Sequence, residues 1–396
     1  MMDACYLLMS FGDNAWGRAA SARALGEDLR RLGRAVKVVS GRAGVGSFEG
    51  SGLAVELLPD LPGSLLKIYF EEMIDRLGPA GIVFCDGDSI LHALHRLKLD
   101  PDLFTRKGTP VFGIDTWSRL EVGLEADVFG DGKQSMQVWP DWLTPIRTAP
   151  LSRIGTGEDV CSGLFHLTVP KGDIGSDPGF LSASPARRFA MISTAPWQHE
   201  DLRDERAARV QREVPALLAS AIGAVPELDL VHVGPEPLQG FQALGPRYHW
   251  MGALPPARYA RLMAKSTVYL SLSPVCSAQA KALGLGIPVL LFQHLETSGR
   301  SKGLPYPFRI WPIGYSSFLE PVLRGNPLSA AVTTAELSRP ESMIQALHDL
   351  TFDGEQRDRV LAQQAGYVQA VRSLPRVASY LIERFEKIPI SNGRSI

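Results

Sequence analysis

Residues 273–294, SPVCSAQAKALGLGIPVLLFQH, place a strand end, a helix and a second strand in one short stretch. The apolar run 268–272 precedes a loop of small residues, and an Ala/Leu-rich helix follows it. The helix is expected to stop at Gly286, with Pro288 just beyond, before the second apolar run at 289–292. Such a compact strand–helix–strand unit predicts a parallel sheet whose strand ends face a ligand.

The same alternation extends along both halves of the chain, which predicts an α/β fold with two parallel sheets. A helical pattern at 18–32 separates apolar runs at 5–11 and 35–39, and Gly33 is a natural stop for that helix. Further strands are expected at 82–85, 111–114, 189–192, 228–233 and 248–251, and further helices at 89–97, 205–222, 255–264, 343–350, 356–373 and 377–387.

The chain length of 396 residues exceeds the usual size of one hydrophobic core. We therefore expect two Rossmann-like, doubly wound domains facing across a cleft, residues 1–184 and residues 185–370. Residues 371–396 are expected to form a C-terminal helix that packs back toward the N-terminal domain. Ligands of open parallel sheets bind at the carboxyl ends of their strands, which places the expected site in the cleft.

The composition excludes several classes of protein. A net charge of −1 gives no basic surface for nucleic acid, and 45% hydrophobic residues are ordinary for a globular protein. No apolar stretch is long enough for a membrane span, and the four cysteines show no paired spacing. We expect a cytoplasmic enzyme without a metal site, whose oligomeric state the sequence leaves open.

The ordered motifs of the second half resemble a GT-B glycosyltransferase. They are Met251-Gly-Ala-Leu-Pro255, the small-residue loop 273–277 and the Gly286-Ile-Pro288 stop. Phe292-Gln293-His294 is also similar to the donor-sugar loop of the peptidoglycan N-acetylglucosaminyltransferase group. The resemblance implies transfer of a sugar from a nucleoside-diphosphate co-substrate, with no further cofactor.

The donor site is expected on the second half. The start of the helix near Ser277 presents unpaired N–H groups and the positive end of a dipole, which suit a diphosphate. Ser277 is also expected to be the N-cap. Lys281 stands where many family members carry a ribose-binding Glu, and it fits either a phosphate contact or a solvated position. The full set of donor-binding candidates is Gly12, Arg18, Ser193, Thr194, Gln198, Gly234, Met251, Gly252, Ala253, Leu254, Cys276, Ser277, Ala278, Lys281, Gln293 and His294.

The acceptor side is expected on the first half, where the family often supplies a His base from the first strand–helix loop. The loop 11–18 contains no His, so Asp13 and Asp115 are the candidate bases, with a turn role as the alternative for Asp13. Trp16, Asp86 and Trp117 are candidates for acceptor contacts. Asp86 fits a helix N-cap equally well.

We therefore predict a biosynthetic glycosyltransferase of secondary metabolism, such as antibiotic biosynthesis, with a small-molecule acceptor. The missing His favours a sulfur or nitrogen nucleophile, or a carboxylate base. A nucleotide-sugar epimerase of the same fold is the first alternative. A non-catalytic protein that binds a nucleotide or sugar and regulates a partner is the second.

Overall fold

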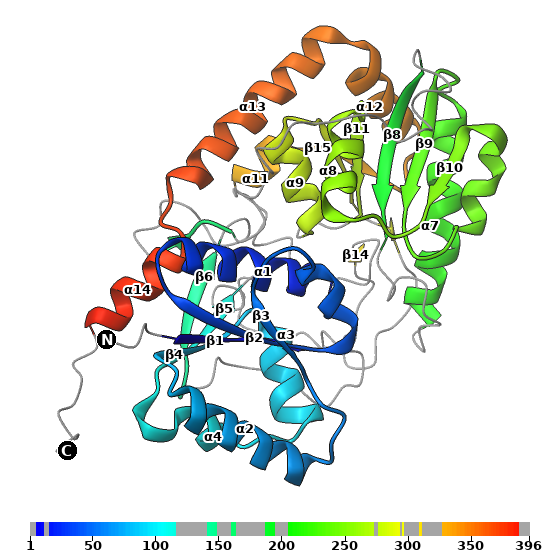
Figure 1. Cartoon of the computed structure of the whole chain (residues 1–396). Helices are drawn as coiled ribbons and strands as arrows, with labels where there is room; N and C mark the ends of the chain where they lie inside the picture. The colour runs from blue at the N-terminus through cyan, green and yellow to red at the C-terminus, as the bar shows by residue number, and fades with distance from the viewer. Residues whose placement is uncertain are drawn as a thin grey trace. The chain divides into compact units, whose positions relative to one another are not determined.

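In the computed structural model the chain forms two units (Figure 1). The first unit spans residues 1–120, 138–165 and 373–396, and the second spans 121–137 and 166–372. Within them the described residues are 5–11, 16–115, 141–148, 160–163, 187–194, 205–272, 276–293, 295–296, 309–310 and 327–387.

The described part of the first unit contains a parallel sheet in the order β3-β2-β1-β4-β5-β6-β7. The strands are β1 (Cys5–Ser10), β2 (Ala35–Ser40), β3 (Ala54–Leu57), β4 (Gly81–Phe84), β5 (Val111–Asp115), β6 (Thr144–Thr148) and β7 (Val160–Cys161). The helices are α1 (Trp16–Arg31), α2 (Gly63–Leu77), α3 (Gly87–Leu91), α4 (Pro101–Thr105) and α14 (Val377–Lys387), with a π-helical turn at His92–Arg96 and 3₁₀ turns at Arg42–Phe48 and Arg106–Gly108.

Helix α14 belongs to the core of the first unit although it lies at the far end of the chain. Its residues Val377, Ala378 and Leu381 are buried with Leu25 and Leu29 of α1. Arg376, just before α14, forms an ion pair with Asp28 of α1 at 3.2 Å. Burial of a large apolar side chain contributes about 1.5–3 kcal/mol, which exceeds what an exposed ion pair provides. Apolar packing therefore holds α14 against α1 more than the ion pair does.

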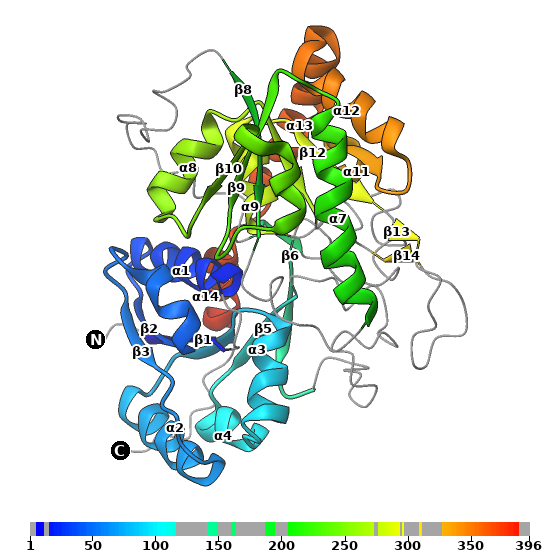
Figure 2. The ribbon, with the colours of Figure 1, turned by 90° about the vertical axis from the view of Figure 1, so that its right-hand side faces the viewer.

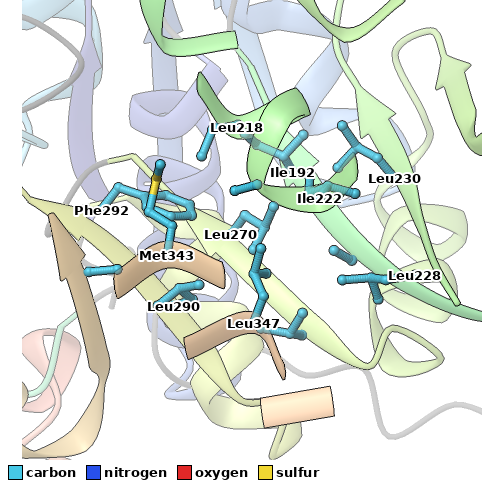
Figure 3. Close-up of a cluster of buried hydrophobic side chains, with 14 of the residues drawn as sticks. Ile192, Leu218, Ile222, Leu228, Leu230, Leu270, Leu290, Phe292, Met343 and Leu347 are labelled. Carbon is cyan, nitrogen blue, oxygen red and sulfur yellow. The ribbon is translucent and has the colours of Figure 1, made fainter. Parts of the chain in front are cut away.

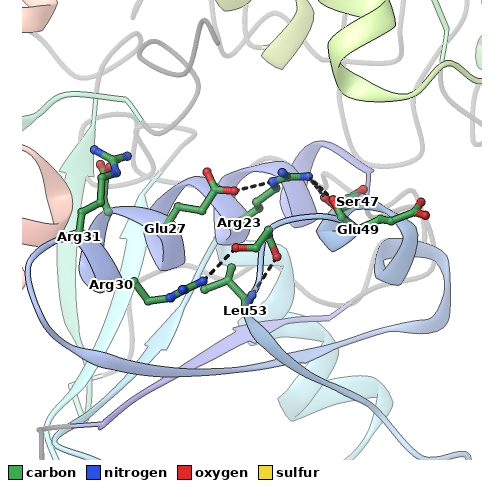
Figure 4. A network of polar contacts seen from close by, with 9 residues as sticks. Arg23, Glu27, Arg30, Arg31, Ser47, Glu49 and Leu53 are labelled. Atoms are coloured by element: carbon green, nitrogen blue, oxygen red, sulfur yellow. Dashed lines mark hydrogen bonds and ion pairs between the residues drawn. The ribbon is translucent and has the colours of Figure 1, made fainter. Parts of the chain in front are cut away.

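Polar contacts tie α1 to the segment that joins β2 and β3 (Figure 4). Arg23 donates to the carbonyl oxygens of Ser47 at 2.9 Å and Glu49 at 3.0 Å, and it pairs with Glu27 at 2.8 Å. Arg30 donates to the carbonyl of Ser51. These bonds satisfy backbone carbonyls that no helix or sheet uses.

The described part of the second unit contains a parallel sheet in the order β10-β9-β8-β11-β12-β15. Figure 2 labels β8, β9, β10 and β12 of this sheet. The strands are β8 (Arg188–Ser193), β9 (Leu228–Val233), β10 (Tyr248–Met251), β11 (Val268–Ser271), β12 (Val289–Gln293) and β15 (Thr333–Glu336). The helices are α7 (Glu205–Gly223), α8 (Pro256–Ala264), α9 (Ser277–Leu285), α11 (Pro327–Ala331), α12 (Pro340–Phe352) and α13 (Gly354–Ser373), with a 3₁₀ segment at Gln239–Arg247. Strands β13 (Leu295–Glu296) and β14 (Arg309–Ile310) form a small antiparallel pair.

Alternate residues of these strands face two different layers. Ile192, Leu230 and Leu270 pack against α7 and α12 in one core cluster (Figure 3). The intervening residues face the other side, where Ser193 of β8 reaches α8. Both faces are therefore covered, as expected for a parallel sheet.

The structure confirms the predicted α/β class and the Gly stop of the opening segment. Gly286 has a left-handed backbone with φ of 71°, and its N–H bonds back to the carbonyls of the last turn of α9. Gly33 has the same role after α1, with φ of 74°. The sequence pattern did not predict α2, because the exposed Leu65 and Ile68 obscure its apolar stripe.

Candidate functional site

The carboxyl ends of three strands in the second unit place several candidate donor residues at one edge of its sheet. Because β8, β9 and β11 are parallel, their carboxyl ends lie on the same side. Ser193 and Thr194 end or follow β8, Gly234 follows β9, and α9 begins soon after β11. Open parallel sheets bind ligands at this edge.

Helix α9 is capped by Cys276, so the prediction that Ser277 is the N-cap was wrong. The Cys276 backbone is extended, and its Sγ accepts from the Gln279 N–H at 3.2 Å. Ser277 is the first helical residue. The Ser271 hydroxyl lies 3.7 Å from the same sulfur. A thiol is an uncommon cap, since sulfur accepts hydrogen bonds weakly, and for this reason the sequence pointed to the serine beside it.

The Cys276 thiol is structural in this setting. Burial raises its pKa, against smaller opposite effects of hydrogen bonds from Gln279 and other neighbours. Because the thiol is neutral, the cap of α9 carries no negative charge that would offset the positive end of the helix dipole. The start of α9, with Ser277 and Ala278 half-buried beside it, therefore keeps its positive end at the sheet edge.

Two tyrosines connect the end of β8 with the start of α9. The hydroxyls of Ser193 and Tyr259 are 2.6 Å apart. Burial raises the pKa of Tyr259 and of Tyr269, and Tyr269 is hydrogen-bonded to this pair and to Cys276. Both phenols therefore stay neutral and act as hydrogen-bonding groups.

Lys281 projects from α9 toward the aromatic ring of Tyr259. Its Nζ lies 5.2 Å from the ring centroid, in a cation–π arrangement, and the side chain is half-buried. The sequence left a solvated helix position open as an alternative. The structure instead places the ammonium against a side chain that reaches the strand edge.

A second polar group links β8, β9 and β10. Thr194 Oγ1 and His232 Nε2 are 2.7 Å apart, and His232 Nδ1 lies 2.8 Å from the Tyr248 hydroxyl. The Leu238 N–H donates to that hydroxyl at 3.2 Å. His232 is fully buried, with Phe241 packed edge-on against its ring.

Gly234 lies directly against the Thr194–His232 pair. A Cβ at this position would overlap Thr194 Oγ1 and approach His232 Nε2 to 2.7 Å. Its carbonyl accepts from the Trp250 indole at 3.0 Å, and its N–H donates to the Met251 carbonyl at 3.1 Å. Glycine is therefore required here for packing, which the sequence did not indicate.

The predicted base-binding segment follows β10 directly. Gly252 and Leu254 are half-buried and Ala253 is exposed, and the segment leads into α8. A Cβ at Gly252 would meet no atom within 4 Å. The backbone of this segment therefore borders open space at the strand edge.

The remaining donor candidates are only partly described. Gln293 ends β12 beside Glu336 of β15, and its side chain is not described. Arg18 and the acceptor candidate Trp16 lie in the first turn of α1, again without described side chains. The other predicted residues outside the described ranges are Gly12, Asp13, Trp117, Gln198 and His294.

In the first unit, Asp86 caps helix α3, as the sequence allowed. Its Oδ1 accepts from the Ser89 N–H at 2.6 Å. The Ser89 hydroxyl in turn accepts from the Phe11 N–H at 3.1 Å and lies 3.3 Å from the Phe11 carbonyl. The Ser89 hydroxyl thus joins the start of α3, just after β4, to Phe11 at the end of β1 and fixes the backbone there.

Asp115 is the last residue of β5, and its side chain is 1% exposed. Its carbonyl accepts from the Thr148 hydroxyl at 3.3 Å. Asp86 and Asp115 thus lie at the carboxyl ends of adjacent strands, both buried. Within the described ranges, no group of three or more His, Cys, Asp or Glu side chains is arranged to hold a metal ion. None of the helices described here is long and apolar enough to cross a membrane.

Two units, each with a doubly wound parallel sheet and a helix starting at the strand edge, define the GT-B fold. The chain belongs to the family described as "Family of unknown function (DUF6365)", which matches residues 25–300 and 293–388. No curated protein matches this sequence.

Solved structures agree with the fold. The glycosyltransferase VinC in complex with dTDP is 12% identical, with 96% of this chain and 98% of that chain covered and a TM-score of 0.57. The spinosyn forosaminyltransferase SpnP is 15% identical, with 98% and 99% covered and a TM-score of 0.57. A putative UDP-N-acetylglucosamine 2-epimerase from Listeria monocytogenes is 14% identical, with 93% and 94% covered and a TM-score of 0.59.

At these identities the likeness establishes the fold alone, and it confirms the predicted GT-B architecture. The similarity of the donor half to the peptidoglycan N-acetylglucosaminyltransferase group stays a prediction. Sequence reasoning missed His232, Tyr248, Tyr259 and Tyr269, since no spacing motif links them. A histidine inside an apolar strand was the one available signal.

Proposed function

We propose that this protein is a glycosyltransferase that moves a sugar from a nucleoside diphosphate to a small-molecule acceptor. The observation that carries the proposal is the start of α9 at the strand edge of the second unit, beside Ser193 and Thr194. The dipole and the first N–H groups of a helix that starts at such an edge favour a diphosphate. Glycosyltransferases for spinosyn and calicheamicin share the fold, which supports an acceptor from secondary metabolism.

Charge stabilisation of the leaving diphosphate is the main chemical role of this edge. The helix start supplies fixed dipoles, and Lys281 supplies a full positive charge close by. Fixed donors aimed at developing charge lower the barrier of group transfer, and this arrangement does not itself require a metal. The backbone of residues 252–254 is proposed to hold the base.

The acceptor is proposed to bind the first unit. Asp115 and Asp13 are the candidates for a general base, and Trp16, Asp86 and Trp117 for acceptor contacts. The buried position of Asp115 at the end of β5 supports its assignment. Asp86 also accepts from the Ser89 N–H and so caps α3.

A thermal-shift panel with dTDP, UDP, GDP, ADP and CDP tests the proposal. We expect one diphosphate to raise the melting temperature more than its monophosphate, because the helix start binds the added phosphate. The matching nucleotide-sugar is then incubated with thiol, amine and hydroxyl acceptors, and products are followed by mass spectrometry. No shift with any nucleotide would contradict the proposal.

A nucleotide-sugar epimerase is the second candidate, favoured by the putative 2-epimerase with a TM-score of 0.59. The two activities differ in their need for an acceptor. Incubation of the donor alone, with nuclear magnetic resonance (NMR) of the sugar, separates them: an epimer without acceptor identifies the epimerase. Tight binding without either product would indicate a regulator that binds the nucleotide.

A further inference from the structure

The hydrogen bonds around His232 form a directed chain across three strands. The Tyr248 hydroxyl oxygen accepts a hydrogen bond from the Leu238 N–H. The proton of the same hydroxyl then points to His232 Nδ1, which lies 2.8 Å from the Tyr248 oxygen. Burial raises the pKa of Tyr248, so the phenol keeps that proton. With Nδ1 accepting, a neutral imidazole carries its proton on Nε2.

The proton on Nε2 fixes the direction of the next bond. Thr194 Oγ1 lies 2.7 Å from Nε2, so in this tautomer the threonine oxygen accepts from the imidazole. A hydroxyl that accepts from one side turns its own proton away from that donor. The Thr194 N–H donates to the Val233 carbonyl at 2.9 Å, which fixes the Thr194 backbone beside β9.

Packing allows little variation in this geometry. The parallel register places Ile192 beside His232 and Ser193 beside Val233, so Thr194 follows next to Gly234. The missing Cβ of Gly234 leaves the room that the Thr194–His232 bond occupies. Phe241 and Tyr248 pack against the imidazole ring and restrict its rotation.

We propose that His232 is a positioning residue for the diphosphate. Its Nε2–H donates to Thr194 and turns the Thr194 hydroxyl proton toward an oxygen of the diphosphate bound at the same strand edge. The identity of this ligand rests on the proposed function, whereas the direction of the hydrogen bond rests on the geometry of the second unit alone. His232 thus acts through Thr194 and does not itself touch the ligand.

The tautomer of His232 is the first test. Long-range ¹H–¹⁵N NMR spectra of full-length protein labelled with ¹⁵N-histidine distinguish the two neutral forms, and His232→Gln assigns the signal. We expect the Nε2–H form in the wild type, and a mixed or inverted signal in Tyr248→Phe, which lacks the donor to Nδ1. An Nδ1–H form in the wild type would overturn the inference, whatever the protein binds.

A double-mutant cycle on ligand affinity is the second test. Calorimetry measures binding of the diphosphate that gives the largest thermal shift to the wild type, Thr194→Val, His232→Gln and the double variant. We expect each single variant to bind about five- to tenfold more weakly, and the double variant to be no worse, because one hydrogen bond is lost in all three. His249→Gln, on β10 and paired with Asp229, is the matched control and should bind like the wild type.

The outcomes separate this inference from the proposed function. The positioning role would be overturned if the double variant lost affinity by the product of the two single losses, or if His232→Gln bound the diphosphate like the wild type. Nucleotide binding itself would stand in either case. If the wild type binds no nucleoside diphosphate, the proposed function fails and the ligand named here fails with it. Should His232→Gln fold poorly, Tyr248→Phe repeats the cycle with Thr194→Val.

Discussion

Lys281 and Tyr259 join helices α9 and α8, with the Lys281 Nζ 5.2 Å from the Tyr259 ring centroid. Tyr259 is itself fixed to the end of β8 through the Ser193 hydroxyl. The contact holds a long cationic side chain close to the strand edge, which reduces the entropy lost when it pairs with an anion. Under the proposed function, this ammonium pairs with a phosphate of the donor.

Replacement of Lys281 by Met tests this role. We expect the affinity for the nucleoside diphosphate to fall about tenfold, because a charge-assisted contact is lost, and the salt dependence of binding to weaken. Calorimetry at two ionic strengths provides the measurement. Arg258→Met removes an exposed cation from α8 and should change neither value, and equal effects of both variants would contradict a specific role for Lys281.

Gly234→Ala is expected to destabilise the protein by about 1–3 kcal/mol, because the added methyl collides with the Thr194–His232 pair. The free energy of unfolding in urea measures the change. Gly252→Ala is the control: its Cβ would meet no atom within 4 Å, and its φ lies outside the left-handed range. A similar loss in both variants would show that the collision at Gly234 is relieved by a backbone shift.

Cys276 offers a test of its role as a cap. Cys276→Ala is expected to lose about 1 kcal/mol of stability, because the Gln279 N–H loses its acceptor. Cys276→Ser should retain the wild-type stability or exceed it, since an oxygen cap is stronger than sulfur. Urea unfolding of both variants provides the measurement.

The raised pKa of the Cys276 thiol leads to a separate expectation for reactivity. Native protein treated with a thiol reagent at pH 8 should modify this cysteine slowly, because the neutral thiol is a poor nucleophile. Peptide mass spectrometry locates the label. Rapid modification of Cys276 in the folded protein would contradict its assignment as a half-buried cap with a raised pKa.

Glu56 of β3 gives the first unit a dependence on pH. Burial alone would raise its pKa, but hydrogen bonds from Lys37 and Tyr69 outweigh burial and hold the pKa of Glu56 below its ordinary value. A lowered folded-state pKa stabilises the protein above the unfolded pKa of about 4.3, and that contribution disappears as the pH falls through the folded-state value. Glu56→Gln should therefore be less stable at pH 7, by at most about 1 kcal/mol at this half-buried, solvent-screened position, and equal to the wild type in strong acid. A constant difference across this range in urea unfolding would contradict the assignment.

The sequence predicted the elements that local patterns specify. Apolar runs with helical or alternating spacing located the strands around α9, and Gly286 with Pro288 located its end. The sequence did not predict elements with a mixed or very short pattern. Helix α2 exposes the apolar residues Leu65 and Ile68, and β7 is only two residues long. The choice of Ser277 over Cys276 as the cap failed because propensity favours oxygen, whereas the backbone placed the sulfur at the capping position.

The sequence by itself determined the α/β class and the alternating order of the elements, and a diphosphate site at residues 273–288 stays a prediction. The tertiary structure decided which polar side chains meet. Ser193 and Tyr259 are 66 residues apart, and Thr194 and His232 are 38 apart. Their contacts depend on the register of parallel strands and on which face of the sheet each helix covers. Local propensity carries no information about that register, so only the folded sheet could reveal His232 beside Thr194.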